Sequence, residues 1–335
     1  MRSFVLVLLL SSWDLCAQTK KILAWNMSPA DVRELQAVTD KARIVPVNAN
    51  NVMQEIADAD AFLGEITPQL VRAGKKLQWV QTRSAGVERV LHLSGSNDLR
   101  DSNIILTNNQ IVQGPEIADH AMAMLLSLTR NIPGFIEMRK SGKWVARRES
   151  LLELNGNTAI IIGCGGIGMQ IAVRAWAHGM KNICVDPEDL PYSPFVVRTV
   201  KPDQLDEVVP EADVIFVAAP HTPQSHKMMG PRQFEKMKRG SFFIAVSRGA
   251  LYDLNALVRA LDSKQLAGAG VDVTDPEPLP EGHPLWKFDN AIITPHIAGR
   301  SDKDAARMMS TIKENIRRFV NGQPLLNVVD KHKGY

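Results

Sequence analysis

The sequence has few of the features that mark metal-binding proteins and nucleic-acid-binding proteins. It contains three cysteines among 335 residues, and aromatic side chains make up only 6%. It has no zinc-ligand spacing, no long run of Lys and Arg, and no pattern of aromatic residues suited to stacking on bases. The formal net charge is only +3. We therefore expect neither a bound metal nor a nucleic-acid partner.

The cysteines are too few and too scattered for a disulfide framework. Cys16 follows an apolar N-terminal run, Cys164 lies in a glycine-rich loop, and Cys184 lies in a predicted buried strand. Small disulfide-stabilised proteins carry many cysteines at regular spacings. We expect Cys164 and Cys184 to be free thiols.

The N-terminus has the pattern of a secretory signal peptide. Arg2 gives a basic start, residues 4–10 are apolar, and Ala17 offers a cleavage point. The apolar run is far shorter than the about 20 residues that span a bilayer, so no stable membrane anchor is expected. Residues 1–17 are predicted to be removed, which would make the protein secreted or periplasmic. The alternatives are a misassigned start codon or a buried first strand, and the protein would then be cytoplasmic.

The rest of the chain alternates β-rich and helical segments, which is typical of parallel sheets with helices on both faces. Its length favours two domains. A long apolar helix is expected at 116–129, a polar connector at 131–150, and a last helix at 304–320. The predicted strands are 21–25, 43–47, 61–64, 77–82 and 104–108 in a first series, and 158–162, 182–185, 196–200, 214–218, 242–246, 268–273 and 291–294 in a second.

The second series opens with a dinucleotide-binding motif. The predicted strand 158–162 runs into the sequence Gly-Cys-Gly-Gly-Ile-Gly at 163–168, and a helical pattern follows. Glycines let the backbone approach a pyrophosphate, whose charge the helix N-terminus stabilises. Asp186 ends the next predicted strand, about 20 residues on, where a carboxylate can accept hydrogen bonds from the ribose hydroxyls. The alternative for Asp186 is a simple turn residue before Pro187.

Reactive side chains follow several of the later strands, and the carboxyl ends of parallel strands share one edge of the sheet. Arg248 could bind a substrate carboxylate, His296 could carry a proton, and Glu277 could orient the histidine and favour its charged form. Each residue taken singly could instead be a surface charge, a loop histidine or a turn acid. His221 is a rival base, but no carboxylate lies near it in the sequence.

Five segments together resemble the D-isomer-specific 2-hydroxyacid dehydrogenases, in the order and spacing of that family. The resemblance covers about residues 20–330. The segments are Ile-Gly-Cys-Gly-Gly-Ile-Gly at 162–168, Ser-Arg-Gly-Ala-Leu at 247–251, Gly-Val-Asp-Val-Thr-Asp-Pro-Glu-Pro at 270–278, His-Pro-Leu-Trp at 283–286 and Thr-Pro-His-Ile-Ala-Gly at 294–299. Ala245 departs from the asparagine that the family often has there.

The resemblance implies an α/β fold with two flavodoxin/Rossmann-like domains, in which a cofactor domain at 116–299 is inserted into a substrate domain at 18–115 plus 300–335. It implies a homodimer, NAD as cofactor, Arg248, Glu277 and His296 as catalytic residues, and Ala85, Gly86 and Arg248 as the substrate-binding residues. The implied cofactor-binding residues are Gly163, Gly165, Gly166, Ile167, Gly168, Asp186, Pro220, Val246, Ser247, Arg248, Asp272, His296 and Gly299.

The expected activity is that of an NAD(H)-dependent oxidoreductase that interconverts a small 2-keto acid and its D-2-hydroxy acid, as a glyoxylate or hydroxypyruvate reductase does. Two alternatives stay open on sequence alone. One is a binding protein or corepressor of the same fold that senses NAD(H), and the other is a phosphite dehydrogenase.

Overall fold

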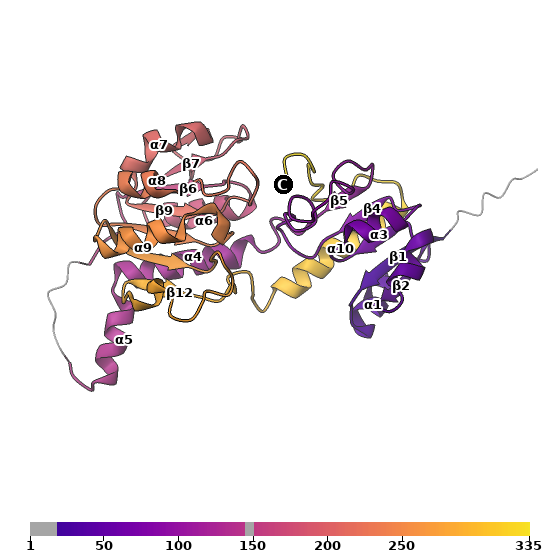
Figure 1. The fold of residues 1–335 in the computed structure, drawn as a ribbon, viewed down its shortest axis with the longest axis horizontal. Helices are drawn as coiled ribbons and strands as arrows, with labels where there is room; N and C mark the ends of the chain where they lie inside the picture. Colours follow the sequence, from indigo (N-terminus) through magenta and orange to yellow (C-terminus); the bar gives the residue numbers. More distant parts are fainter. Residues whose placement is uncertain (1–18, 145–150) are drawn as a thin grey trace, which may run out of the picture.

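The computed structural model describes residues 19–144 and 151–335. The predicted signal peptide at 1–17, including Cys16, lies outside the described residues. The described chain forms two α/β domains side by side, each built on one parallel sheet (Figure 1). Within the described ranges, no helix combines the length and the apolar character needed to cross a membrane.

The smaller domain has five parallel strands in the order β2-β1-β3-β4-β5, the flavodoxin-like arrangement. Ser28 caps its first helix reciprocally with Asp31, which satisfies two backbone N–H groups that the helix leaves free. The strands are β1 (Lys20–Trp25), β2 (Ala42–Val47), β3 (Ala61–Leu63), β4 (Trp79–Gln81) and β5 (Ile105–Thr107), and the helices between them are α1 (Pro29–Gln36), α2 (Val52–Glu55) and α3 (Pro68–Ala73).

The larger domain has seven parallel strands in the order β12-β11-β10-β9-β6-β7-β8. The order reverses at β6, which pairs with β7 on one side and β9 on the other, so a crevice for a ligand is expected at the carboxyl ends there. The elements are β6 (Thr158–Ile162), α6 (Gly166–Ala177), β7 (Lys181–Val185), β8 (Arg198–Val200), α7 (Leu205–Val208), β9 (Val214–Val217), α8 (Pro231–Lys236), β10 (Ser241–Ala245), α9 (Leu254–Asp262), β11 (Leu266–Val271) and β12 (Ala291–Ile293).

Both faces of each sheet are covered, and β6 shows why. Ile160 and Ile162 pack into the core on one side, whereas Ala159 and Ile161 pack into the core on the other. Successive side chains of a strand point to opposite faces, so a strand buried on both faces must be apolar throughout. The continuous apolar run at 159–162 is therefore the sequence signal for a central strand.

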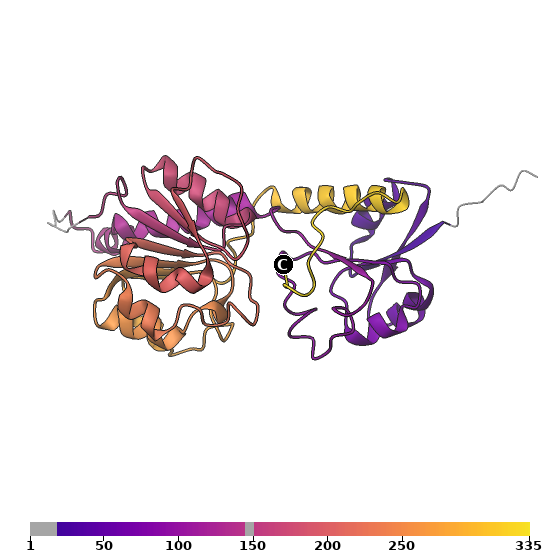
Figure 2. The ribbon, with the colours of Figure 1, turned by 90° about the horizontal axis from the view of Figure 1, so that it is seen from above.

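Two helices connect the domains. After β5 the chain enters α4 (Gly114–Thr129), which packs on α6 and β11 of the larger domain. The last helix, α10 (Asp304–Val320), returns and packs Ile312 and Ile316 into the same core as Trp79 of the smaller sheet (Figure 2). The larger domain is thus inserted into the smaller one, which confirms the expected fold class. The exact borders near 115 and 299 stay predictions.

The segment predicted as a polar connector contains a helix, so that prediction is wrong for its first part. Helix α5 (Ile132–Lys140) follows α4 after Asn131 and projects away from both sheets in Figure 1. Pro133 in its first turn fits a helix start, because proline has no N–H to leave unpaired there. Residues 145–150 lie outside the described ranges. Ile132, Ile136 and Trp144 are exposed on this arm, and the homodimer stays a prediction.

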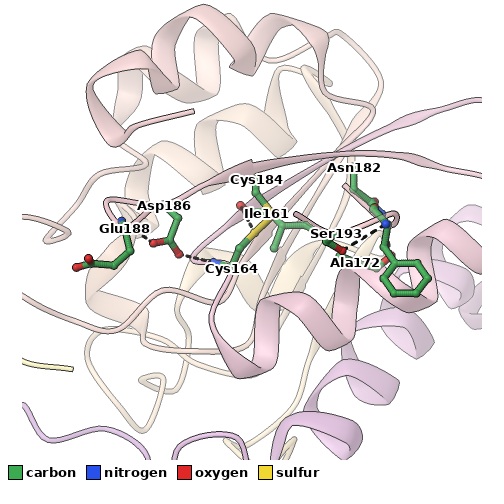
Figure 3. The surroundings of a disulfide bond; sticks show 9 residues. Ile161, Cys164, Ala172, Asn182, Cys184, Asp186, Glu188 and Ser193 are labelled. Carbon is green, nitrogen blue, oxygen red and sulfur yellow. Dashed lines mark hydrogen bonds between the residues drawn. A yellow bond between two sulfur atoms is a disulfide. The ribbon is translucent and has the colours of Figure 1, made fainter. Parts of the chain in front are cut away.

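The prediction of free thiols is also wrong, because Cys164 and Cys184 form a disulfide (Figure 3). Strands β6 and β7 pair so that Ile161 lies opposite Cys184. The chain turns at Gly163, whose φ of +85° suits glycine, and this turn brings Cys164 back beside Cys184, with the Cα atoms 5.9 Å apart. The spacing of the cysteines in the sequence carries no sign of this pairing, since it depends on which strands are neighbours.

Candidate active site

A cavity of about 740 Å³ lies between the two domains, at the carboxyl ends of the larger sheet's strands. Both domains line it. The smaller domain contributes the loop that holds Ala85 and Gly86. Of the residues predicted to bind cofactor or substrate, all but Gly168 line this cavity: Ala85, Gly86, Gly163, Gly165, Gly166, Ile167, Asp186, Pro220, Val246, Ser247, Arg248, Asp272, His296 and Gly299.

The glycines of the loop after β6 serve two different purposes. A Cβ at Gly168 would lie 1.9 Å from the Gly163 carbonyl oxygen, so this glycine lets α6 pack closely on the strand. A Cβ at Gly165 would meet no heavy atom within 4 Å, so this part of the loop borders open space. The start of α6 at Gly166 directs the free N–H groups of a helix N-terminus into the same region. An anionic group fits there.

Asp186 is held rigidly beside the glycine loop. Its Oδ2 accepts a hydrogen bond of 2.8 Å from the Cys164 N–H, and its Oδ1 accepts one of 2.9 Å from the Glu188 N–H (Figure 3). The side chain is largely buried but lines the cavity. Each carboxylate oxygen has a further lone pair for a ligand hydroxyl.

His296 and Glu277 form a hydrogen-bonded pair on the opposite side of the cleft. The distance between His296 Nδ1 and Glu277 Oε2 is 2.9 Å. Glu277 Oε1 accepts a hydrogen bond from the Thr274 N–H, which fixes the carboxylate. Glu277 lines a second cavity of about 400 Å³, and this cavity shares Gly86, Arg248 and His296 with the first. The two cavities therefore adjoin at these residues.

Arg248 contacts the smaller domain. Its Nε donates a 2.7 Å hydrogen bond to Glu88 Oε1, and its Nη1 donates one of 2.7 Å to the Ser247 carbonyl. Its Nη2 lies against Gly86, where a Cβ would come within 2.0 Å of it. Burial would raise the pKa of Glu88, but the charge and hydrogen bond of Arg248 outweigh burial and lower it. Glu88 is therefore a carboxylate at neutral pH.

His221, the rival base, bonds to another histidine. Its Nε2 lies 3.2 Å from His226 Nδ1. Burial lowers the pKa of His221, and the neighbouring His226 lowers it further. His221 is consequently neutral at neutral pH and is a poor proton donor, although it lines both cavities. The geometry favours His296, which has a carboxylate partner.

Comparison with known proteins identifies this arrangement. A model of the D-isomer specific 2-hydroxyacid dehydrogenase NAD binding domain matches residues 122–298. The chain belongs to the D-isomer specific 2-hydroxyacid dehydrogenase family. The matched segment contains the glycine loop, Asp186 and the His296–Glu277 pair, and an NAD-type cofactor is the ligand that the glycine loop and its acid fit.

Relatives match over most of the chain. A glyoxylate reductase of Korarchaeum cryptofilum is 28% identical and covers 89% of this chain and 90% of its own length. A D-3-phosphoglycerate dehydrogenase of Archaeoglobus fulgidus is 31% identical over 79% of this chain, which spans only 50% of that relative's length. The crystal structure of a D-isomer specific 2-hydroxyacid dehydrogenase from Xanthobacter autotrophicus Py2 in complex with NADPH and MES has a TM-score of 0.79 at 25% identity, and covers 95% of this chain and 100% of its own.

Asp272, one of the predicted cofactor-binding residues, also holds the loop that carries His296. Its Oδ1 accepts hydrogen bonds from the Thr294 hydroxyl (2.6 Å) and the Ile297 N–H (2.9 Å), and its Oδ2 accepts one from the Ala298 N–H (2.9 Å). Thr294 also contacts helix α4, because its hydroxyl oxygen lies 2.9 Å from His120 Nε2. Neither His120 nor Glu88 was predicted, because their partners are more than 150 residues away in the sequence.

If the substrate is the keto acid expected from the sequence, Glu88→Gln should raise its KM about five- to twentyfold with a smaller change in kcat. The charge-assisted bond to Glu88 keeps the guanidinium facing Gly86, and such bonds are roughly twice as strong as neutral ones. Steady-state kinetics would measure both constants, with Glu235→Gln on α8 as the control. An unchanged or lower KM would mean that Glu88 does not orient Arg248 for the substrate but competes with it.

Proposed function

We propose that this family member is an NAD(H)-dependent oxidoreductase that interconverts a small 2-keto acid and its D-2-hydroxy acid. The observation that carries the proposal is the His296–Glu277 pair, 2.9 Å apart, which adjoins Arg248 and the glycine loop in one cleft. A proton carrier, a cation for a carboxylate and a dinucleotide loop are the three parts that this reaction needs. A protein that only binds the cofactor would not need a proton carrier.

Each residue has a distinct part in ketone reduction. The bound nicotinamide supplies the hydride. Arg248, with the N–H groups of the loop at Ala85 and Gly86, holds the substrate carboxylate, and His296 donates a proton to the oxygen of the reacting carbonyl. Glu277 stabilises the protonated ring and fixes its orientation through Nδ1, which leaves Nε2 to face the substrate. In the oxidative direction, His296 accepts the proton from the hydroxyl group.

Glyoxylate and hydroxypyruvate are the substrates that we propose first. The glyoxylate reductase of Korarchaeum cryptofilum, which matches 89% of this chain and 90% of its own length, supports this choice. The second cavity, beside Glu277 and Arg248, measures about 400 Å³, which is ample for either acid.

We expect His296→Ala to lower kcat for keto-acid reduction about 10²- to 10⁴-fold, the usual contribution of one acid–base side chain, while NADH affinity stays nearly unchanged. Glu277→Gln removes the charge that stabilises protonated His296, so the pH optimum for reduction should move downward. Arg248→Lys should raise KM and also slow turnover, since an ammonium group cannot form the bidentate contact. These effects can be measured with glyoxylate, hydroxypyruvate and phosphite as alternative substrates.

His178→Ala, an exposed histidine after α6, is the matched control and should leave the kinetics unchanged. Full activity of His296→Ala would reject the assignment and direct attention to His221. Equal losses of thermal stability and NADH binding in all three variants would show that these residues only hold the loops. Turnover of phosphite, with no turnover of glyoxylate or hydroxypyruvate, would show that phosphite and not a keto acid is the substrate.

We also propose that NAD(H) is preferred over NADP(H). The carboxylate of Asp186 would repel a 2′-phosphate, and Pro187, Glu188 and Asp189 follow it instead of an arginine. The two lysines nearby are already paired, Lys201 with Asp189 and Lys333 with Glu188. The ratio of kcat/KM for NADH to that for NADPH should exceed roughly tenfold, which corresponds to about 1.4 kcal/mol. Equal efficiency with both cofactors would contradict this preference.

Finally, we propose that the mature protein begins at Gln18 and is exported. The basic start and apolar run support a signal peptide, and the Cys164–Cys184 disulfide is of the kind that persists in oxidising compartments. N-terminal sequencing of protein from its native host should find Gln18 first, and thiol labelling before reduction should leave Cys164 and Cys184 unmodified. Protein that keeps Met1 or Arg2 would refute export and would assign the protein to the cytoplasm.

A further inference from the structure

Residues 330–335 follow the last contact of the chain with the smaller sheet. Val328 forms an antiparallel bridge with Thr107 of β5, and the Val329 N–H donates to the Leu106 carbonyl. Beyond this point the chain forms a compact turn, in which the Asp330 N–H donates to the Tyr335 carbonyl and the Gly334 N–H donates to the Asp330 carbonyl. We call residues 330–335 the strap. In Figure 2 it lies between the two domains.

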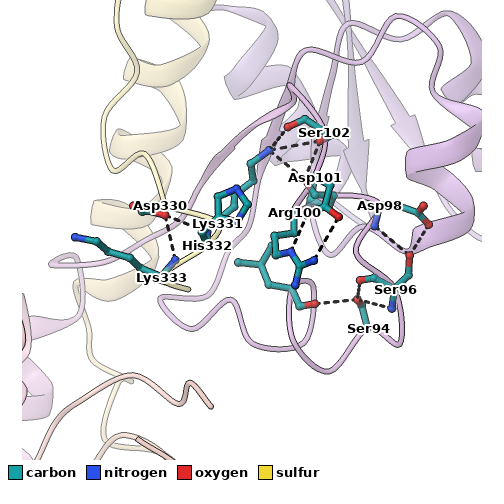
Figure 4. Close-up of polar contacts among 12 residues, drawn as sticks. Ser94, Ser96, Asp98, Arg100, Asp101, Ser102, Asp330, Lys331, His332 and Lys333 are labelled. Carbon is teal, nitrogen blue, oxygen red and sulfur yellow. Dashed lines mark hydrogen bonds and ion pairs between the residues drawn. The ribbon is translucent and has the colours of Figure 1, made fainter. Parts of the chain in front are cut away.

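The strap is anchored firmly on the smaller domain. The ammonium group of Lys331 donates to three backbone carbonyls, those of Leu99 (3.0 Å), Ser102 (2.6 Å) and Ile104 (2.8 Å). Figure 4 shows Lys331 beside Ser102. Gly334 has a φ of +87°, and a Cβ there would lie 2.4 Å from Nε2 of His92. Only glycine fits this close approach without displacing the histidine. The root of the strap is therefore built into the smaller domain.

The far end of the strap reaches the larger domain. Lys333 Nζ donates to Glu188 Oε1 at 2.6 Å, and the Tyr335 hydroxyl donates to the same oxygen at 2.7 Å. The hydrogen bonds from Lys333 and then Tyr335 lower the pKa of Glu188, which is thus a carboxylate at neutral pH. Burial raises the pKa of Tyr335, and the bond to Glu188 raises it further, so the phenol keeps its proton and remains a donor.

The contact with Glu188 lies at the cofactor acid. The N–H of Glu188 itself bonds to Asp186 Oδ1. His332, Lys333, Gly334 and Tyr335 line the same cavity as Gly165 and Asp186. In this fold the pyrophosphate lies at the glycine loop and the adenosine ribose lies at the acid. The strap therefore borders the adenosine end of the cavity and is fixed to the opposite domain.

We propose that the strap is part of the cofactor site: Lys333 and Tyr335 close the adenosine end of the cleft against Glu188, and this closure slows release of the cofactor. The inference rests on the NAD-type cofactor of the family and adds the strap to the residues that border the cofactor site. It also means that both domains hold the adenosine half, although the dinucleotide-binding motif belongs to only one of them.

The test compares Tyr335→Phe, Lys333→Met and Glu188→Gln with the wild-type chain. Tyr335→Phe and Lys333→Met each remove one donor of the contact, and Glu188→Gln removes the negative charge that strengthens both bonds. All three keep most of the side-chain volume. NADH fluorescence titration should show a Kd raised roughly three- to tenfold, as expected for the loss of one charge-assisted hydrogen bond. Stopped-flow displacement should show that most of the change lies in a faster dissociation rate. Glu188→Gln combined with Tyr335→Phe should change Kd by less than the product of the single effects.

Tyr192→Phe is the matched control. Tyr192 belongs to the same domain as Glu188, is 92% exposed and does not line the cavity. It should leave Kd and the dissociation rate unchanged. Unfolding midpoints measured without cofactor should be alike for all variants, which separates a cofactor contact from a merely structural one. An unchanged Kd in the strap variants, or tighter binding, would overturn the proposal. Tighter binding would mean that the strap blocks the cofactor site. Failure of the wild-type chain to bind NADH would instead reject the proposed function.

Discussion

Both carboxylate oxygens of Asp272 accept hydrogen bonds from the loop after β12, and the position of His296 depends on them. His296 has a φ of +53°, an uncommon backbone conformation for a residue that is not glycine. The bonds to Thr294, Ile297 and Ala298 on either side hold the histidine in that conformation. In that conformation the ring of His296 meets Glu277. The buried carboxylate of Asp272, at the end of β11, therefore determines the geometry of the His296–Glu277 pair in the cleft.

The second constraint is that both domains line the candidate active site. The Arg248–Glu88 ion pair joins the rim of the larger sheet to the loop of the smaller one. A side chain at position 86 would collide with both residues, so only glycine fits there. Any motion that opens the cleft must break or bend this contact. Helices α4 and α10 are the continuous elements between the domains, so they are the natural places for such a motion to be absorbed.

Much of the fold could be read from the sequence, because buried parallel strands are short apolar runs and the last helix has a clear period. Strand 158–162 and helix 304–320 were predicted with the bounds that the structure has. Helix α5 was missed since Pro133 and Gly134 look like turn residues, although proline suits a first turn. The disulfide, the Glu88 contact and the strap could not be predicted, because each depends on residues that only the folded chain brings together.

The Cys164–Cys184 bond has a consequence for how the cofactor loop behaves before any ligand arrives. A flexible glycine-rich loop would lose conformational entropy when a dinucleotide binds, and affinity would be lower by that amount. Here the covalent link ties the loop to β7, and the amide of Cys164 is bonded to Asp186. The loop is therefore held in place before the ligand arrives, and binding begins from a preorganised surface. Gly165 leaves room for the ligand, while the disulfide of the preceding residue limits the motion that glycines otherwise permit.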